Sequence, residues 1–261
     1  MKKLKEAFEA KKKHVIPYLT PDFPFVNTTE RLAVEFDRLG IKILELGIPY
    51  SDPLADGETI QKASSIAIKN GVDVKRVLDI AKKISETTKI SVVLMGYLNQ
   101  MLQFGFEKFL CEAKGSGVQG IIIPDLPQDE CVRYKSLADK YDIAFIFLVA
   151  PTSSAERIKL ISERSSIFSY CVSMNGVTGK SGVDYENLKN LTTHVSTYHE
   201  KPFVVGFGLS TPKDIRFVTK LAKGAVVGSA LLKSISRAKS AEEAVLLGTE
   251  FIKPLAEAVN E

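Results

Sequence analysis

IKILELGIPYSDPLADG, residues 41–57, is the stretch of sequence that decides the fold. Its first half, residues 41–48, is an almost unbroken apolar run, and such runs form the strands of parallel sheets that are covered on both faces. Its second half is a polar loop that is longer than a minimal connection. A buried strand followed by a long polar loop is typical of α/β enzymes, which keep their chemistry on the loops after their strands.

Seven further apolar runs alternate along the chain with amphipathic stretches. They lie at residues 15–20, 90–95, 120–124, 143–149, 167–173, 203–208 and 225–231. With no polar linker or low-complexity tract between them, the runs predict one (β/α)8 TIM barrel over residues 1–261, with an N-terminal capping helix. A doubly wound open sheet is the alternative. It usually carries a glycine-rich fingerprint after its first strand, whereas this chain has Pro-Tyr-Leu-Thr-Pro there.

Capping residues predict where several helices begin. Residues 27–30 (Asn-Thr-Thr-Glu) offer a capping box, and residues 153–156 (Ser-Ser-Ala-Glu) and 240–243 (Ser-Ala-Glu-Glu) have similar patterns. Residues 211–212 (Thr-Pro) predict an N-cap followed by a first-turn proline. In the last of these helices, Pro254 is expected to form a kink.

The charge of the chain limits its partners. It carries 35 basic and 31 acidic residues, a formal net charge of +4. This mild excess favours anionic small molecules and falls far short of a nucleic-acid-binding surface. The densest basic cluster, within residues 2–13, has apolar residues at helical spacing, so we interpret it as the solvated face of a short helix. A partner-binding tail is the alternative.

The cysteines, histidines and hydropathy exclude other classes of protein. Three widely spaced cysteines predict reduced thiols in a cytoplasmic protein, and no signal peptide or membrane-spanning run is found. None of the three histidines has a cysteine or carboxylate at metal-ligand spacing, so no metal site is predicted.

Glycine motifs fall at the ends of the last three predicted strands. They are residues 176–179 (Gly-Val-Thr-Gly), 206–210 (Gly-Phe-Gly-Leu-Ser) and 228–229 (Gly-Ser). Glycine lets backbone N–H groups approach an anion closely, and barrels commonly bind phosphate between these loops and a short extra helix, here expected to start near Ser229. One motif alone would indicate only a turn, but the three together predict a phosphate site.

Carboxylates near the end of the second strand are the candidate catalytic groups. Glu45 interrupts an apolar run, and in the barrel mouth partial desolvation would raise its pKa toward neutrality, as a group that both donates and accepts a proton requires. The alternative is a structural ion pair with a lysine. Asp56, on the adjoining loop, is either a second catalytic carboxylate or a turn residue. Tyr170 is either a phenol of the same pocket or a core aromatic.

Residue types that are missing narrow the chemistry. We find no strand-end lysine of the kind that a Schiff-base aldolase uses, and no histidine cluster for a metal-dependent aldolase. What remains is proton transfer by carboxylates on a phosphorylated substrate, with no cofactor.

Residues 44–57, LELGIPYSDPLADG, closely resemble the signature of the tryptophan synthase alpha chain family. The resemblance continues in the family's order through residues 59–61, 94–99, 124–127, 176–179, 206–208 and 228–229, so it covers nearly the whole chain. It implies a lyase that cleaves indole-3-glycerol phosphate into indole and glyceraldehyde 3-phosphate by a retro-aldol reaction.

The resemblance also implies roles for individual residues. The residue that matches Glu45 protonates indole C3 and helps to deprotonate the glycerol hydroxyl, the one that matches Asp56 stabilises charge at the indole nitrogen, and the one that matches Tyr170 is an auxiliary. The other implied contacts are with substrate through Tyr18, Ile60, Phe207 and the closing-loop residue Thr178, and with phosphate through Gly179, Gly208, Gly228 and Ser229.

A partner is implied in the same way. In the family, the loops that hold Asp52 and Pro53 and residues 176–182 face a beta subunit in an αββα heterotetramer. That beta subunit binds pyridoxal phosphate and receives the indole through a tunnel. No cofactor is therefore assigned to this chain.

The chain departs from the family pattern at Glu58, where proline is common, and at residues 20–24, 40–42 and 174–175. Three other functions stay open. They are a non-catalytic subunit that only activates its beta partner, a free-standing lyase that releases indole, and another phosphate-binding barrel enzyme such as an isomerase.

Overall fold

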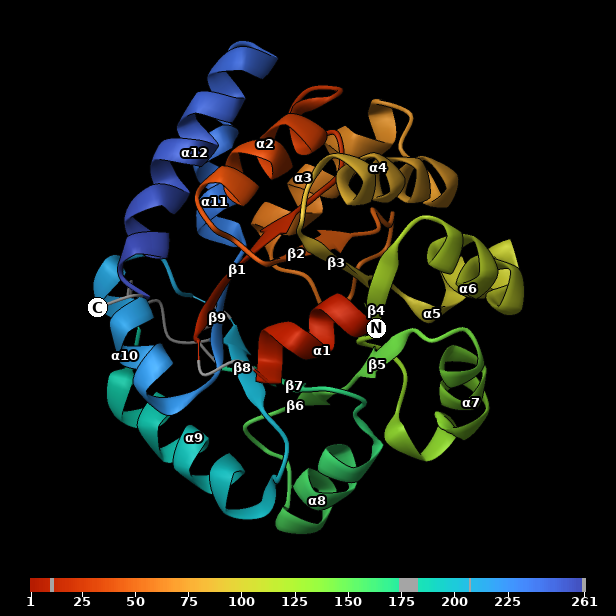
Figure 1. Cartoon of the computed structure of the whole chain (residues 1–261), viewed down its shortest axis with the longest axis vertical. Coiled ribbons are helices and arrows are strands. Elements are labelled where there is room, and N and C mark those ends of the chain that lie inside the picture. Colours follow the sequence, from red (N-terminus) through yellow and green to blue (C-terminus); the bar gives the residue numbers. More distant parts are fainter. Residues whose placement is uncertain (10–11, 174–182, 207, 260–261) are drawn as a thin grey trace.

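Parallel strands form a closed ring at the centre of the protein (Figure 1). The computed structural model describes residues 1–9, 12–173, 183–206 and 208–259. The strands within these residues are β1 (His14–Leu19), β2 (Ile43–Gly47), β3 (Ser91–Met95), β4 (Val118–Ile122), β5 (Ala144–Ile146), β6 (Leu148–Val149), β7 (Ser169–Val172), β8 (Phe203–Gly206) and β9 (Gly224–Val227). Nearly every strand residue is buried, as a sheet covered on both faces requires.

The fifth predicted run closes the barrel. The strands are ordered β5-β4-β3-β2-β1-β9-β8-β7-β6, so the two ends of the sheet are β5 and β6, which only Phe147 separates. β5 pairs with β4, and β6 pairs with β7. At the break, the Phe147 N–H donates to the Ser165 hydroxyl, and the Phe147 carbonyl accepts from the Tyr170 N–H at 2.9 Å. The predicted (β/α)8 barrel is therefore confirmed, and the open sheet is excluded.

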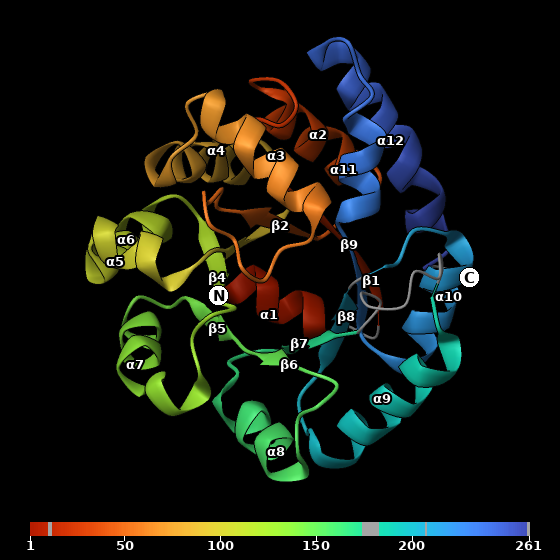
Figure 2. The same cartoon turned by 180° about the vertical axis from the view of Figure 1, so that it is seen from behind.

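Helices surround the strands on the outside of the ring (Figures 1 and 2). They are α2 (Thr28–Arg38), α3 (Glu58–Lys69), α4 (Val74–Thr87), α5 (Leu98–Phe104), α6 (Phe106–Gly115), the 3-10 turn η1 (Gln128–Glu130), α7 (Val132–Lys140), α8 (Ala155–Arg164), α9 (Tyr185–Tyr198), α10 (Pro212–Leu221), α11 (Ser229–Ile235) and α12 (Ala241–Glu257). The last predicted strand, residues 225–231, was too long, because β9 ends at Val227. The short extra helix expected near Ser229 is α11.

The N-terminal helix α1 (Lys2–Glu9) lies across one end of the ring (Figure 1). Its apolar side, Leu4 and Phe8, is buried, and the Phe8 ring stacks on Phe168 with centroids 4.3 Å apart. The Leu4 N–H donates to Gln119 Oε1 at 3.0 Å, next to the start of β4. Since these contacts are made near the N-terminal ends of strands, α1 is the predicted cap, and the chemistry is left to the opposite end.

Two predicted helix starts are confirmed. Thr211 caps α10, where its hydroxyl accepts from the Asp214 N–H at 3.2 Å and Pro212 is the first helical residue. Ser240 caps α12 in the same way, and this helix continues across Pro254. Satisfying these otherwise unpaired N–H groups contributes about 1 kcal/mol at each helix.

Two other predicted starts were wrong in detail. Helix α8 is capped by Ser154, one residue later than expected. At α2, Asn27 adopts a left-handed backbone (φ 66°) and its side chain caps nothing. Glu30 does not fold back to the helix start, because Arg76 and Lys83 of α4 lie 3.4 and 3.6 Å from its carboxylate.

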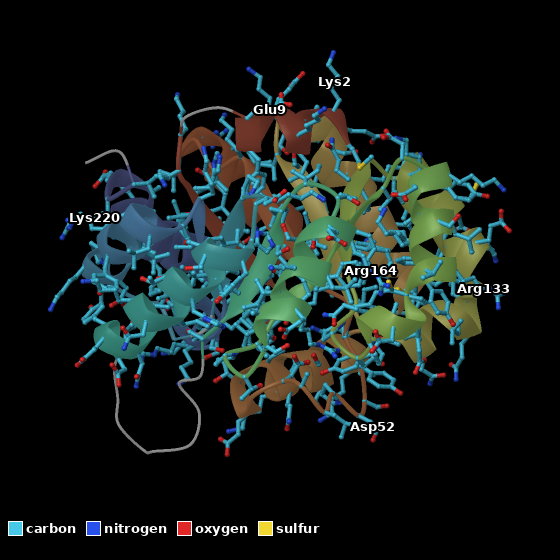
Figure 3. The ribbon with its side chains drawn as sticks, turned by 90° about the horizontal axis from the view of Figure 1, so that it is seen from below. Lys2, Glu9, Asp52, Arg133, Arg164 and Lys220 are labelled. Carbon is cyan, nitrogen blue, oxygen red and sulfur yellow. The ribbon has the colours of Figure 1, made fainter. Side chains whose placement is uncertain are left out.

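Figure 3 shows the polarity of the barrel from the side. Lys2 and Glu9 of α1 lie at one end of the molecule, and Asp52 lies at the other. Asp52 belongs to the loop between β2 and α3, so the C-terminal ends of the strands open toward this second end. This is the end at which barrel enzymes carry their active sites.

Candidate active site

Glu45 occupies the middle of β2 and is only 2% exposed. It is the only carboxylate in any described strand. In register it lies between Tyr18 of β1 and Val93 of β3. Together with Tyr170 and apolar side chains it lines a small cavity inside the barrel that holds roughly one water molecule. Among the described residues it forms no ion pair with a lysine, so the alternative of a structural salt bridge is not supported.

Asp56 lies on the loop between β2 and α3 and is half-buried. Its backbone N–H donates to the Pro53 carbonyl at 3.1 Å, and its own carbonyl accepts from Gln61 Nε2 at 2.8 Å. Gly57, the next residue, is the N-cap of α3 and has no side chain with which to cap it. These bonds fix the loop so that the Asp56 carboxylate faces the group formed by Glu45 and Tyr18, whose pKa values respond to its charge.

Two tyrosines enter the barrel mouth by leaning over glycines on the neighbouring strands. Tyr18 of β1 lies over Gly47 of β2, and a Cβ on that glycine would collide with the Tyr18 hydroxyl. Tyr170 of β7 lies over Gly206 of β8 in the same way. Both phenol rings are nearly buried, at 7% and 6% exposure. The missing side chains of the two glycines therefore make the space in which the two hydroxyls stand beside Glu45.

Burial raises the pKa values of the Glu45 and Asp56 carboxyls by different amounts. It raises the pKa of Glu45 to about 8, to which the negative charge of Asp56 contributes. It raises the pKa of Asp56 only to about 6, because a hydrogen bond from Tyr97 stabilises the ionised form. Burial also raises the pKa of Tyr18 and of Tyr170, so both stay neutral phenols. Near neutral pH, Glu45 is therefore mostly an acid that can donate a proton and Asp56 is mostly an anion.

Of the three glycine motifs expected to hold phosphate, those around Gly208 and Gly228 lie at the same end of the barrel, and residues 176–179 fall outside the described residues. Gly208 is exposed and has φ 78°, a conformation that strongly favours glycine. Gly228 is the N-cap of α11, and Ser229 is its exposed first residue. Asp214 fastens the chain after Gly208, because its carboxylate accepts from the backbone N–H groups of residues 210 and 211 at 3.0 and 2.8 Å.

The structure describes only some of the remaining predicted residues. Ile60 lies in the first turn of α3, partly buried against the core, and Asp52 and Pro53 lie on the loop before it. Thr178, Gly179 and Phe207 lie outside the described residues, and so does the departure at residues 174–175.

Tyr97 also belongs to this site, although its residue type and position in the sequence predict no role for it. It lies within residues 94–99, one of the stretches that carry the family resemblance, and that was the available signal. It follows β3, and its hydroxyl accepts the Ala55 N–H at 2.9 Å.

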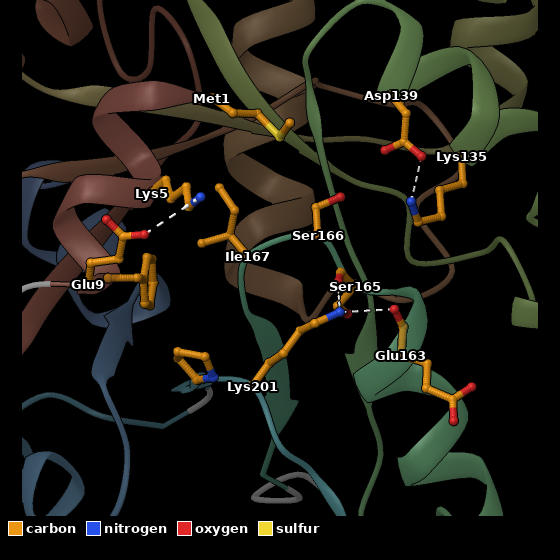
Figure 4. Close-up of a pocket in the computed structure, with 12 residues that line it drawn as sticks. Met1, Lys5, Glu9, Lys135, Asp139, Glu163, Ser165, Ser166, Ile167 and Lys201 are labelled. Atoms are coloured by element: carbon orange, nitrogen blue, oxygen red, sulfur yellow. Dashed lines mark hydrogen bonds and ion pairs between the residues drawn. The ribbon is translucent and has the colours of Figure 1, made fainter.

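A second pocket lies at the opposite end of the barrel, beside α1 (Figure 4). Its lysines already have partners. Lys5 pairs with Glu9, Lys135 pairs with Asp139, and Lys201 donates to the carbonyls of Glu163 and Ser165 at 2.9 and 2.6 Å. Lys201 therefore binds backbone carbonyls at the C-terminal end of α8. Because the lysines of this pocket are paired and it lies at the end of the barrel opposite Glu45, it is not the candidate active site.

Two negative findings hold for the part of the chain that the structure describes. No group of three or more His, Cys, Asp or Glu side chains is placed to hold a metal ion. No helix has both the length and the apolar character needed to cross a membrane.

Comparison with known proteins agrees with this geometry. The family model described as tryptophan synthase alpha chain matches residues 4–260. The chain belongs to the tryptophan synthase alpha chain family. The alpha chain of Petrotoga mobilis is 42% identical over 235 residues, which cover 90% of this chain and 91% of the relative. That of Dehalococcoides mccartyi is 39% identical over the full length of both chains.

Solved structures of tryptophan synthase share the whole fold. Tryptophan synthase subunit alpha from Legionella pneumophila str. Paris superposes with a TM-score of 0.90 at 31% identity, covering 99% of this chain and 97% of that one. A chain of Mycobacterium tuberculosis tryptophan synthase in its aminoacrylate-bound form gives 0.87 at 28% identity, covering 98% and 99%. The predicted family, barrel and lyase function in tryptophan biosynthesis are therefore confirmed, and the alternative of an unrelated isomerase is excluded.

Proposed function

We propose that this alpha chain cleaves indole-3-glycerol phosphate with Glu45 as the proton-transfer group and Asp56 as the charge-stabilising group. One observation carries the proposal. Glu45 is buried in the barrel mouth with its pKa raised to about 8, while Asp56 beside it has a pKa of about 6. Two carboxyls whose environments separate their pKa values are what a reaction needs when one must donate a proton while the other stays charged.

The proposed reaction conserves its protons. Glu45 first gives its proton to C3 of the indole ring, because indole is a poor leaving group until that carbon is protonated. The Asp56 carboxylate accepts a hydrogen bond from the ring N–H and stabilises the positive charge that develops there. The Glu45 carboxylate then takes the proton of the adjacent glycerol hydroxyl. The bond between that carbon and C3 breaks, which gives the aldehyde and indole and returns Glu45 to its acid form.

The rest of the site would hold the substrate. Tyr18, Ile60 and Phe207 are proposed to line the indole pocket, with Tyr170 as an auxiliary. The N–H groups at Gly179, Gly208, Gly228 and Ser229 are proposed to hold the phosphate. The positive φ of Gly208 and the position of Gly228 at the start of α11 support this assignment, since glycine without a Cβ lets a ligand approach the backbone closely and a helix start presents unpaired N–H groups. Thr178 is proposed to act on a loop that closes over the substrate.

A beta subunit is the proposed partner, in an αββα heterotetramer that takes up the indole. Asp52 and Pro53 would lie at the interface, and the position of Asp52 at the open end of the barrel supports direct passage of indole (Figure 3). The pyridoxal phosphate would belong to the partner, so we assign no cofactor to this chain. A cytoplasmic location stays a prediction.

Turnover of indole-3-glycerol phosphate by the purified chain, with and without a beta subunit, tests the proposal. We expect indole and glyceraldehyde 3-phosphate in equal amounts from the isolated chain and a faster rate on mixing. Cleavage by neither preparation would refute the catalytic assignment. Activation of the beta chain without any cleavage would identify a non-catalytic subunit. Cleavage with no binding to beta and no rate change would identify a free-standing lyase.

A further inference from the structure

Tyr97 holds the loop that carries Asp56, although nothing in the reaction itself calls for a third phenol beside Tyr18 and Tyr170. We propose that Tyr97 is a positioning residue whose hydroxyl clasps the Ala55 N–H and the Asp56 carboxylate together. This inference rests on the proposed role of Asp56 in the reaction.

The position of the hydroxyl carries the argument. Tyr97 follows β3 and is 6% exposed, so its ring is fixed in the protein rather than free in solvent. Its oxygen accepts the Ala55 N–H at 2.9 Å. A phenol has one proton, and because the oxygen acts as acceptor toward Ala55, that proton is left to donate to the Asp56 carboxylate.

Other bonds tie the same two segments together. Gln100 Nε2 donates to the Pro49 carbonyl at 2.7 Å, and Gln100 Oε1 accepts the Tyr97 N–H at 3.4 Å. The Tyr97 ring also lies against the Tyr50 ring, with centroids 5.2 Å apart. The chain after β3 therefore holds the start of the β2–α3 loop through Gln100 and its end through Tyr97.

The hydroxyl has a consequence that ring packing alone would not have. A hydrogen bond donated to a carboxylate favours its ionised form, and the Tyr97 hydroxyl opposes the effect of burial on the pKa of Asp56. Without it, Asp56 would be less ionised near neutral pH and its loop would lose a fastening point at Ala55. Both losses fall on the group that is proposed to stabilise the transition state.

The test compares Tyr97→Phe with Tyr50→Phe. The first variant keeps the ring and removes only the clasping hydroxyl, so it should fold. The second keeps a ring in the same pair but removes a hydroxyl whose partner among the described residues is the exposed Asn99 side chain, which donates to it at 3.3 Å. Titration of ¹³C-labelled aspartate by NMR, and hydrogen exchange at the Ala55 amide, would be measured on both variants and on the wild type.

We expect Tyr97→Phe to move the Asp56 titration to higher pH and to speed exchange at Ala55, with neither change in Tyr50→Phe. The kcat for indole-3-glycerol phosphate should fall between about 10- and 100-fold while KM changes little, as for a misplaced catalytic group. An unchanged Asp56 titration would overturn the clasp whether or not the chain is active. A wild-type chain that cleaves nothing, with or without a beta subunit, would refute the proposed function, and the titration would still decide on Tyr97.

Discussion

The Glu45 side chain lines a small cavity with Tyr170 and with apolar side chains from the surrounding strands, so its carboxyl has hydrocarbon and aromatic rings around it in place of a counter-charge. Holding an ionised group there without a partner costs several kcal/mol, and the pKa of the side chain rises instead. At the scale of the residue, the raised pKa of Glu45 therefore follows from a burial that no counter-charge offsets.

Replacing Glu45 by Gln removes the transferable proton while keeping the size of the side chain. We expect kcat to fall about 10³-fold or more, because general acid–base catalysis contributes roughly 10² to 10⁴ and this group acts twice. The circular dichroism spectrum and the affinity for inorganic phosphate should be unchanged. Glu250→Gln, on the exposed side of α12, is the matched control. Near-normal turnover by Glu45→Gln would refute the role.

The same substitution should change how stability depends on pH. The pKa of Glu45 rises from 4.5 to about 8 on folding, so the stability that its protonated form contributes is complete below about 4.5 and is lost as the pH rises through about 8. Glu45→Gln cannot ionise and should not lose it. In urea titrations the variant should gain stability relative to the wild type between pH 5 and 9. A difference that stays constant over this range would mean that Glu45 is not desolvated.

Asp56→Asn should lower kcat by about 10² to 10³, the usual cost of removing a charge-stabilising group. In the wild type, kcat/KM should rise with pH through about 6 as Asp56 ionises and fall through about 8 as Glu45 loses its proton. The variant should lose the acid limb, and its alkaline limb should move to lower pH, because the charge of Asp56 contributes to the raised pKa of Glu45. Glu58→Gln, nearby on α3, is the control. A rate loss below about tenfold would count against the role of Asp56.

At the scale of elements, neighbouring strands make room for the site. A tyrosine on one strand needs a glycine on the next, as in the pairs Tyr18–Gly47 and Tyr170–Gly206. Each pair joins strands that hydrogen-bond in register, so the position of each phenol is fixed by the sheet. The geometry of the mouth is thus a property of strand pairs and of no single strand.

Gly47→Ala should destabilise the fold by about 1 to 3 kcal/mol, because the added methyl group would overlap the Tyr18 hydroxyl in a closely packed mouth. Thermal unfolding measures the loss, and activity should fall with it as Tyr18 is displaced. Gly115→Ala, at the last residue of α6, is the matched control, since a Cβ there meets nothing within 4 Å. Equal melting temperatures for the two variants would contradict the proposed packing.

At the scale of the whole molecule, the two ends of the barrel have different tasks. Helix α1 closes one end with Leu4 and Phe8, and the loops at the other end hold the candidate site. Leu54 stands at this second end with 97% of its side chain exposed. Leu54 adjoins Asp52 and Pro53, the proposed contacts with the beta subunit, so we propose that the partner buries it.

Leu54→Asp should weaken binding of a beta subunit at least about tenfold, because it places a charge where the partner is expected to bury an apolar side chain. Isothermal titration calorimetry measures the affinity. The melting temperature of the isolated chain should not change, since the Leu54 side chain is exposed and its substitution removes no buried contact. Leu246→Asp, at an exposed position on α12, is the control. Equal affinities for the two variants would place the partner elsewhere.

The sequence by itself determined the barrel and its family, and it singled out two carboxylates as catalytic candidates. Apolar runs at regular spacing can be satisfied only by strands covered on both faces, and a glutamate inside one of them is conspicuous because burial of a lone charge is costly. It also located the caps at Thr211 and Ser240, whose signals lie within four consecutive residues. That residues 1–261 form a single domain remains a prediction.

Only the tertiary structure decided what depends on contacts between distant segments. Glu30 pairs with Arg76 and Lys83 of another helix and does not cap its own. The hydroxyl of Tyr97 accepts the N–H of Ala55, which lies 42 positions earlier in the sequence. The difference in pKa between Glu45 and Asp56 likewise follows from depth of burial and from neighbours on separate loops. Local patterns report what a residue prefers, whereas side-chain partners and desolvation are set by how the whole chain folds around it.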